Sequence, residues 1–132
     1  MRTVLLVDDS ATFRRVVSNM LKDHFNVVGQ GRDGVEGLRM QRELRPDLIL
    51  LDITMPNMNG KECLEAILKE NSGAKVIMVS SLGDEVTVKA CLDLGAKMFV
   101  NKDKISLGGL DMNPELRNAI DEVLGKCIAE EK

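Results

Sequence analysis

The sequence predicts an α/β fold, a doubly wound parallel sheet with five strands and five helices. Short apolar runs alternate five times with longer stretches in which apolar residues recur every third or fourth position, as in strands alternating with amphipathic helices. Two of the runs, Leu48–Leu51 and Val76–Val79, are apolar throughout, which is typical of strands buried on both faces. Right-handed crossovers between parallel strands would place helices on both faces of such a sheet.

Local signals place each element in order. The expected strands are Val4–Val7, Asn26–Val28, Leu48–Leu51, Val76–Val79 and Met98–Val100. Ser10 can cap the first helix, because its hydroxyl can accept a hydrogen bond from a backbone amide of the first turn. Three glycines, Gly29, Gly31 and Gly34, mark the exit from the second strand. Arg45-Pro46 ends the second helix, since the residue before a proline disfavours the helical conformation.

The remaining helices also carry start and stop signals. Gly60 starts the third helix, and Asn71-Ser72-Gly73 ends it. The fourth helix spans Asp84 to Leu94 and is closed by Gly95. Pro114 suits the first turn of the last helix, where its missing amide is not needed. The apolar face of that helix consists of Leu116, Ala119, Ile120, Val123, Leu124, Cys127 and Ile128.

Composition excludes several classes of protein. With 132 residues, 44% of them hydrophobic, the chain can fill one core, so we expect a single domain over residues 1–132. A net charge of −3 gives no footprint for nucleic acid, and no apolar run is long enough for a membrane span or a secretory signal. We therefore expect a cytoplasmic protein. Cys63, Cys91 and Cys127 are widely separated, and we interpret them as core residues.

Charged and hydroxyl side chains follow four of the predicted strands. They are Asp8 and Asp9 after the first strand, Asp52 after the third, Ser80 with Ser81 at the fourth, and Lys102 after the fifth. Taken singly, each has an ordinary explanation, such as an acidic pair at a helix start or a solvated lysine. In an open parallel sheet, however, the carboxyl ends of the strands line the ligand site, so we expect these side chains to converge.

Three carboxylates crowded at one edge repel one another unless a cation joins them. The Lys102 ammonium has no lone pair for a metal, so all the available ligands are oxygens. Oxygen ligands favour Mg²⁺, for which Mn²⁺ could substitute. Mg²⁺ also accepts phosphate oxygens, so the site suits phosphoryl chemistry. Asp52 is the natural acceptor, since a carboxylate can form an acyl phosphate and the loop that follows leaves it room. Ser80 and Lys102 could each contact a phosphoryl oxygen.

Four segments resemble the bacterial response-regulator receiver domains, and the resemblance extends over nearly the whole chain. They are LLVDDSATFRR at 5–15, LILLDITMPNMNG at 48–60, VIMVSS at 76–81 and FVNKD at 99–103. The resemblance implies a flavodoxin-like sheet in strand order 2-1-3-4-5. It also implies that Asp52 is the phosphoacceptor, that Asp9 binds Mg²⁺ directly and Asp8 partly through water, and that the Thr54 backbone carbonyl is a third ligand.

The same resemblance implies a switch and its partners. Lys102 matches the family's lysine, and Ser80 would move toward the phosphoryl group while Phe99 turns inward. The donor would be a phosphohistidine of a sensor histidine kinase, and the chain would not be an enzyme beyond its own phosphorylation and dephosphorylation. DDSATFRR and PNMNG look most like stand-alone, CheY-like chemotaxis receivers. We therefore expect a monomer that binds the kinase and the flagellar motor switch or another regulator.

Other readings stay open within this family, and two positions depart from it. VSSLGDEVT is similar to the receiver of chemotaxis methylesterases, so an excised receiver, a phosphorelay shuttle or a phosphate sink are alternatives. Asp103 stands where the family has a proline, often after a cis peptide bond. We expect a trans bond here, since a cis bond before a non-proline residue costs roughly 3 to 4 kcal/mol. This departure bears on the long 103–113 loop that follows, and Phe99 replaces the usual tyrosine.

Two rivals from other classes are weaker. GQGRDG at 29–34 matches the dinucleotide fingerprint, but that reading leaves the acidic residues and Lys102 unexplained. A phosphatase of the haloacid dehalogenase type needs a second aspartate as general acid, where this chain has Thr54. The lone His24 has no catalytic partner in the sequence, and we expect it at the end of the first helix.

Overall fold

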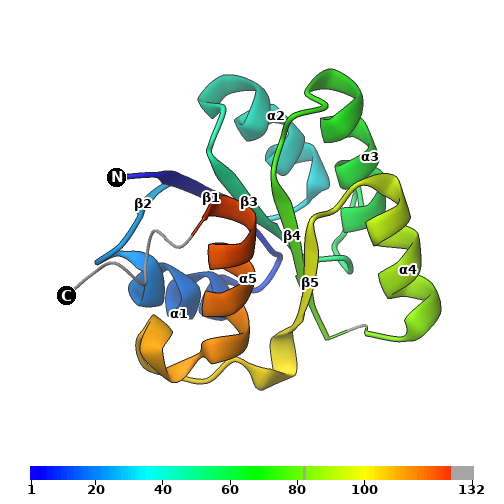
Figure 1. Cartoon of the computed structure of the whole chain (residues 1–132). Helices are drawn as coiled ribbons and strands as arrows, with labels where there is room; N and C mark the ends of the chain where they lie inside the picture. The colour runs from blue at the N-terminus through cyan, green and yellow to red at the C-terminus, as the bar shows by residue number, and fades with distance from the viewer. Residues whose placement is uncertain (82, 126–132) are drawn as a thin grey trace.

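The computed structural model describes residues 1–81 and 83–125, which form a five-stranded parallel sheet covered by helices on both faces (Figure 1). The strand order β2-β1-β3-β4-β5 confirms the predicted fold class. The strands are β1 (Thr3–Val7), β2 (Asn26–Gly31), β3 (Leu48–Leu51), β4 (Val76–Ser80) and β5 (Met98–Asn101). The helices are α1 (Ala11–Leu21), α2 (Gly34–Leu44), α3 (Gly60–Glu70), α4 (Glu85–Leu94) and α5 (Pro114–Leu124). Two short 3₁₀ turns, η1 (Lys102–Lys104) and η2 (Leu110–Met112), lie between β5 and α5.

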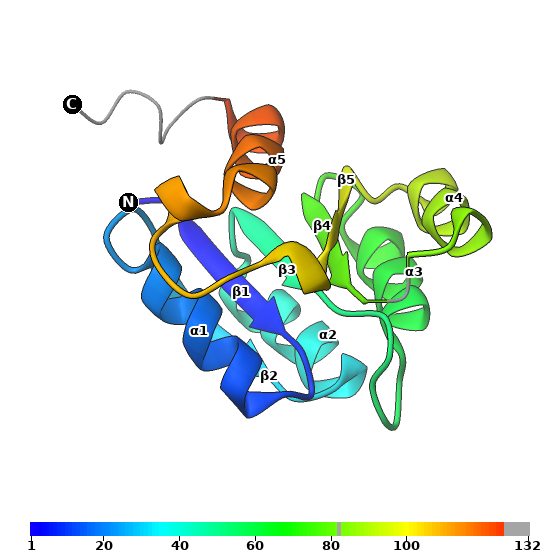
Figure 2. The same cartoon turned by 90° about the horizontal axis from the view of Figure 1, so that it is seen from below.

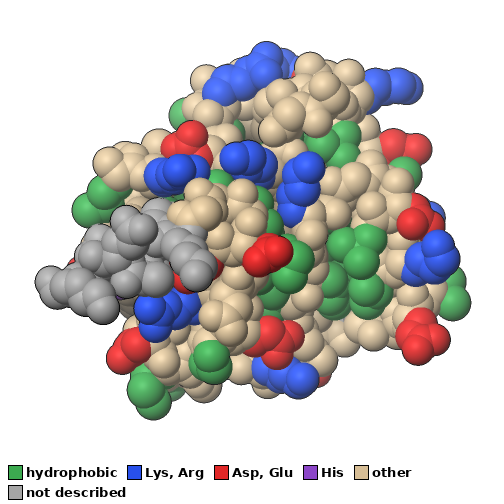
Figure 3. Space-filling view, in the orientation of Figure 1, with side chains coloured by type: hydrophobic (Ala, Val, Ile, Leu, Met, Phe, Trp, Pro, Cys, Tyr) green, Lys and Arg blue, Asp and Glu red, His purple; other side chains and the backbone are tan. Residues whose placement is uncertain are grey.

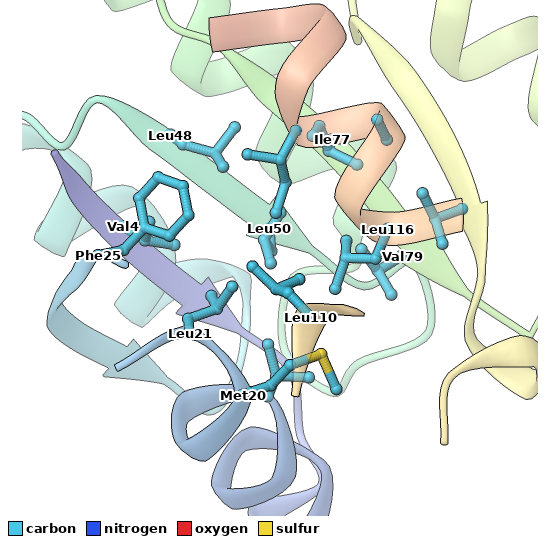
Figure 4. Close-up of a cluster of buried hydrophobic side chains, with 14 of the residues drawn as sticks. Val4, Met20, Leu21, Phe25, Leu48, Leu50, Ile77, Val79, Leu110 and Leu116 are labelled. Atoms are coloured by element: carbon cyan, nitrogen blue, oxygen red, sulfur yellow. The ribbon is translucent and has the colours of Figure 1, made fainter. Parts of the chain in front are cut away.

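The sheet separates two hydrophobic cores. On one face, α1 and α5 pack against β1, β3 and β4 through a cluster that includes Phe25, Leu50 and Leu116 (Figure 4). On the other face, α2, α3 and α4 pack through a cluster that includes Cys63, Ile67 and Cys91. Figure 2 shows α1 and α5 on one side of the sheet and α2 and α3 on the other. Every residue of β3 and β4 is buried, as the continuous apolar runs predict.

Several boundaries differ from the sequence prediction. Strand β2 continues to Gly31 instead of ending at Val28, because Gly29 to Gly31 pair with β1 through backbone groups that the apolar pattern does not register. Asp84 lies one residue before α4 and caps it, its carboxylate accepting from the Thr87 amide. Helix α1 ends at Leu21, so His24 lies in the turn after the helix and does not end it.

Cysteine and capping predictions can be compared directly with the structure. Cys63 and Cys91 are fully buried, which confirms them as core residues, whereas Cys127 lies outside the described residues. Ser10 caps α1 by accepting a hydrogen bond from the Phe13 amide at 3.1 Å, and Pro114 is the first residue of α5. Helix α5 is described as far as Leu124. Among the described residues no helix combines the length and apolar character that a bilayer span requires.

The 103–113 loop is folded against the molecule. Asn113 is 3% exposed, and its side-chain amide accepts from the Ser106 backbone amide and donates to the Ser106 and Gly109 carbonyls. Leu110 inserts among core side chains of α1 and α5 (Figure 4). The Lys102-Asp103 peptide bond is trans, as expected without a proline. This packing holds Lys102, at the start of the loop, in a defined place.

Candidate functional site

Three acidic residues meet at the carboxyl edge of the sheet. Asp8 and Asp9 follow β1 and Asp52 follows β3, the strand beside it, so the parallel register brings their side chains together. One carboxylate oxygen from each lies within 4.8 Å of the others. Asp8 and Asp52 are buried, with 4% and 5% exposure, whereas Asp9 is exposed. The predicted convergence is therefore present, with one acid open to solvent and two held inside.

Backbone amides fix the two buried carboxylates. The Asp52 amide donates to the Val7 carbonyl at 2.9 Å, which extends the pairing of β1 and β3 by one residue. One oxygen of Asp52 accepts from the Ile53 amide at 2.8 Å, and one oxygen of Asp8 accepts from the Ser10 amide at 2.8 Å. Each carboxylate thus keeps its second oxygen turned toward the centre of the site.

Lys102 joins those second oxygens. Its ammonium nitrogen lies 2.6 Å from Asp8 Oδ2 and 3.2 Å from Asp52 Oδ2, and the side chain is 19% exposed. The same nitrogen lies over the ring of Phe13 on α1, 4.5 Å from the ring centre. Lys102 reaches the site from η1, where Asn101 caps the turn by accepting from the Asp103 amide at 2.8 Å.

The electrostatics of the site favour uptake of a further cation. Burial raises the pKa of the Asp8 carboxyl, and the charge of Asp52 adds to this, although hydrogen bonds from Lys102 and Ser10 oppose it. For Lys102 burial lowers the pKa, but the hydrogen bond to Asp8 and the charges of Asp52 and Asp8 outweigh burial and raise it. Three carboxylates meet beside a single ammonium, so the site holds an excess of negative charge.

A solvent-open hollow lies beside this cluster. Its lining residues are Asp9, Asp52, Thr54, Ser80, Ser81 and Lys102. The structure thus brings Ser80, which is 2% exposed, and Thr54 to the same site as the acids. Oxygen ligands at mutual distances below 5 Å fit Mg²⁺, which prefers carboxylates, carbonyls and water. The residues present therefore fit the metal that the sequence predicts.

The loop after Asp52 is held by its neighbours. The Gly60 amide donates to the Ile53 carbonyl at 2.7 Å, and a capping box of Asn59 and Glu62 starts α3 at that point. Asn57, with φ at 67°, donates from its side chain to Asp33 at 2.7 Å. The loop is thereby tied to the starts of both α2 and α3, and its Thr54 stays at the rim of the hollow.

Phe99 lies on β5, half-buried, and packs against the core cluster formed with α3 and α4. A Cβ added to Gly83, which lies between β4 and α4, would lie 3.8 Å from its ring, so Phe99 lies next to Gly83. Its place is compatible with a core role and with a switch role, and the switch stays a prediction.

Two contacts of the site are absent from the sequence prediction. Phe13 belongs to a helical apolar pattern that indicates only a core position, yet its ring lies against Lys102. The Ser81 hydroxyl donates to Asp103 Oδ1 at 3.0 Å, linking the ends of β4 and β5. The sequence marks Asp103 as unusual, since it stands where receiver domains have proline, but no sequence pattern predicts its hydrogen bond with Ser81.

Gly34, the last glycine of the dinucleotide-like motif, serves packing. The Gly34 amide donates to the Met58 carbonyl at 2.9 Å, and a Cβ on Gly34 would lie 2.4 Å from that oxygen. Gly37, one turn further along α2, lies against Val7 and would clash with it if it carried a Cβ. The start of α2 is therefore covered by the 57–58 segment, which leaves no room there for a pyrophosphate.

Comparison with known proteins places these features in a family. The family model of the response regulator receiver domain matches residues 4–107. The chain is 40% identical over 103 residues to the chemotaxis protein CheY of Listeria monocytogenes, covering 77% of this chain and 87% of that protein. It is 45% identical over 130 residues to protein-glutamate methylesterase/protein-glutamine glutaminase 2 of Nitratidesulfovibrio vulgaris, covering 93% of this chain but only 35% of that protein. The chain thus spans about a third of the length of this methylesterase relative.

Solved structures give the same result. The response regulator domain of Thermotoga maritima CheB superposes with a TM-score of 0.84 at 40% identity, covering 93% of this chain and 96% of that one. A chain of the CheX-CheY-BeF3-Mg+2 complex from Borrelia burgdorferi superposes with a TM-score of 0.80 at 34% identity, covering 92% and 88%.

Proposed function

Because this chain belongs to the family of response regulator receiver domains, we propose that Asp52 accepts a phosphoryl group from a histidine kinase and thereby switches a protein-binding surface. The observation that carries the proposal is the meeting of the Asp8, Asp9 and Asp52 oxygens within 4.8 Å, beside the half-buried Lys102. Clustered carboxylates repel one another, which is unfavourable in the absence of a bound cation. A cation bound there would offset this repulsion and could in turn bind an anionic phosphoryl group.

The residues divide the work of phosphoryl transfer. An oxygen of the Asp52 carboxylate forms the new bond to phosphorus, the bond from phosphorus to the donor histidine nitrogen breaks, and that nitrogen keeps the electron pair. We infer that Lys102, which lies 3.2 Å from Asp52 Oδ2, would pair with a phosphoryl oxygen, and that the Ser80 hydroxyl, which lines the same hollow, would donate to another. When bound by Asp8, Asp9, Asp52 and the Thr54 carbonyl, Mg²⁺ would neutralise the remaining negative charge.

The switch would act on the surface formed by α4, β5 and α5. Ser80 ends β4, and Phe99 on the neighbouring β5 lies close to Gly83, so a shift of Ser80 toward a phosphoryl group would change the space around Phe99. Figure 3 shows apolar side chains gathered between β5 and α4, and Leu92 and Val86 of α4 are exposed. Such a surface suits a protein partner, which in chemotaxis would be the flagellar motor switch or another regulator.

The similarity to both CheY proteins and CheB receivers supports chemotaxis as the pathway. In this setting the chain works as a phosphorylated protein of a two-component system. A receiver that forms part of a methylesterase, a phosphorelay shuttle and a phosphate sink would use the same site with a different output.

Phosphorylation by a small donor tests the proposed function. Acetyl phosphate with Mg²⁺ is expected to add one phosphoryl group to the native chain, read as a mass increase of the intact protein. Removal of Mg²⁺ by a chelator is expected to slow this reaction by about tenfold or more, since the carboxylates then repel the donor. A reaction that runs equally fast in chelator would contradict a role for the metal in this site.

A further inference from the structure

The contact between Lys102 and Phe13 is not required by the phosphoryl transfer to Asp52 proposed above. The ammonium nitrogen lies 4.5 Å from the centre of the ring, within the range of a cation–π interaction. The ring is half-buried and lines the small apolar space beneath the site together with Ile105 and Leu116, next to Asp8 and Asp52. The Lys102 ammonium thus contacts two carboxylates and one aromatic face.

The position of Phe13 is itself fixed by the fold. Its backbone amide donates to the capping hydroxyl of Ser10 at 3.1 Å, in the first turn of α1. The same turn follows directly from Asp8, whose carboxylate accepts from the Ser10 amide. One short segment therefore places both an acid and a ring beside the Lys102 ammonium.

Binding of Mg²⁺ by the acidic cluster would weaken the ion pair between Asp8 and Lys102 but not the contact between Lys102 and Phe13. The carboxylate oxygen of Asp8 that contacts Lys102 at 2.6 Å belongs to the group that would bind Mg²⁺, and a divalent cation repels the ammonium. A ring face does not compete for Mg²⁺, which prefers oxygen ligands. The cation–π contact of Lys102 with Phe13 would therefore persist when its ion pair with Asp8 weakens.

We propose that Phe13 is a positioning residue, whose ring keeps the Lys102 ammonium beside Asp52 while the carboxylates are engaged by the metal. This inference rests on the proposed function and adds a residue to it. Phe13 acts through Lys102 and does not itself touch the phosphoryl group. Replacement of the ring by an aliphatic side chain should therefore weaken binding of a phosphoryl group or its mimic only as long as Lys102 is present.

A double-mutant cycle with beryllofluoride tests this coupling. With saturating Mg²⁺, Phe13→Leu is expected to bind beryllofluoride about three- to tenfold more weakly than the native chain, by calorimetry, as loss of a partly buried cation–π contact implies. Phe13→Tyr should restore native affinity because it restores the ring. In the Lys102→Ala background, Phe13→Leu should have no further effect. An equal loss in both backgrounds, or none in either, would overturn the proposal.

Two further measurements separate this role from packing. Phe25→Leu removes a ring from the same core, between the end of α1 and the start of β2, and should lower the melting temperature while leaving beryllofluoride affinity unchanged. In the metal-free protein, the Lys102 Cε protons should be shifted upfield by the ring in NMR spectra, and the shift should persist when Mg²⁺ is added. Loss of the shift on adding Mg²⁺ would overturn the inference alone, whereas a native chain that binds no beryllofluoride would overturn the proposed function with it.

Discussion

Asp52→Asn is expected to abolish phosphorylation by acetyl phosphate. The substitution keeps the shape of the side chain, so the hydrogen bond from the Ile53 amide at 2.8 Å can persist. It removes the charged oxygen that attacks phosphorus, because a neutral amide is not a nucleophile toward a phosphoryl donor. The expected result is no mass increase of the intact protein under conditions that fully modify the native chain.

Asp47→Asn is the matched control for this experiment. Asp47 precedes β3 as Asp52 follows it, so the two aspartates stand at opposite ends of one strand. Its carboxylate accepts from the Thr3 amide at 2.8 Å and is exposed, far from the acidic cluster along the strand. Asp47→Asn should be phosphorylated like the native chain. Equal modification of Asp52→Asn and the native chain would move the acceptor to another residue.

Gly60→Ala is expected to destabilise the fold and disturb the site together. A Cβ at this position would lie 1.9 Å from the Asp52 carbonyl oxygen and 2.7 Å from the Ile53 Cα. Both neighbours are backbone atoms, which cannot move aside as a side chain can, so the start of α3 must shift away from the end of β3. We expect a loss of about 3 kcal/mol or more in the free energy of unfolding, measured by urea denaturation.

Gly73→Ala provides the comparison for Gly60→Ala. Gly73 is exposed in the turn before β4, and a Cβ there would meet only Asn71 Oδ1, at an ordinary contact distance of 3.7 Å. Its effect on stability should stay within about 1 kcal/mol. If the two alanine variants unfold at the same urea concentration, the close approach of α3 to Asp52 is not what requires glycine at position 60.

Strand boundaries were predicted more accurately for buried strands than for the edge strand β2. Strands β3 and β4 are buried along their whole length, so their continuous apolar runs marked them to within one residue. Strand β2 is an edge strand with partly exposed residues, and its last three residues, Gly29-Gln30-Gly31, pair through the backbone. A pattern of side-chain hydrophobicity cannot register such pairing, which is why the predicted end fell three residues short.

The site was predictable where topology alone brings residues together. Carboxyl ends of parallel strands meet at one edge, so Asp8, Asp9 and Asp52 could be expected there from their sequence positions. The contact of Phe13 with Lys102 depends instead on how α1 and η1 pack in three dimensions. Gly60 could be recognised as a helix start, but its approach to the Asp52 backbone appears only in the structure.

A Mg²⁺ titration followed by calorimetry is the most direct test of the idea that the acids at the sheet edge exist to hold a metal. The native chain is expected to bind a single Mg²⁺, and Asp9→Asn, which removes only the exposed member of the cluster, is expected to bind it at least about tenfold more weakly. A native chain that takes up no Mg²⁺, or an Asp9→Asn variant with unchanged affinity, would contradict the account.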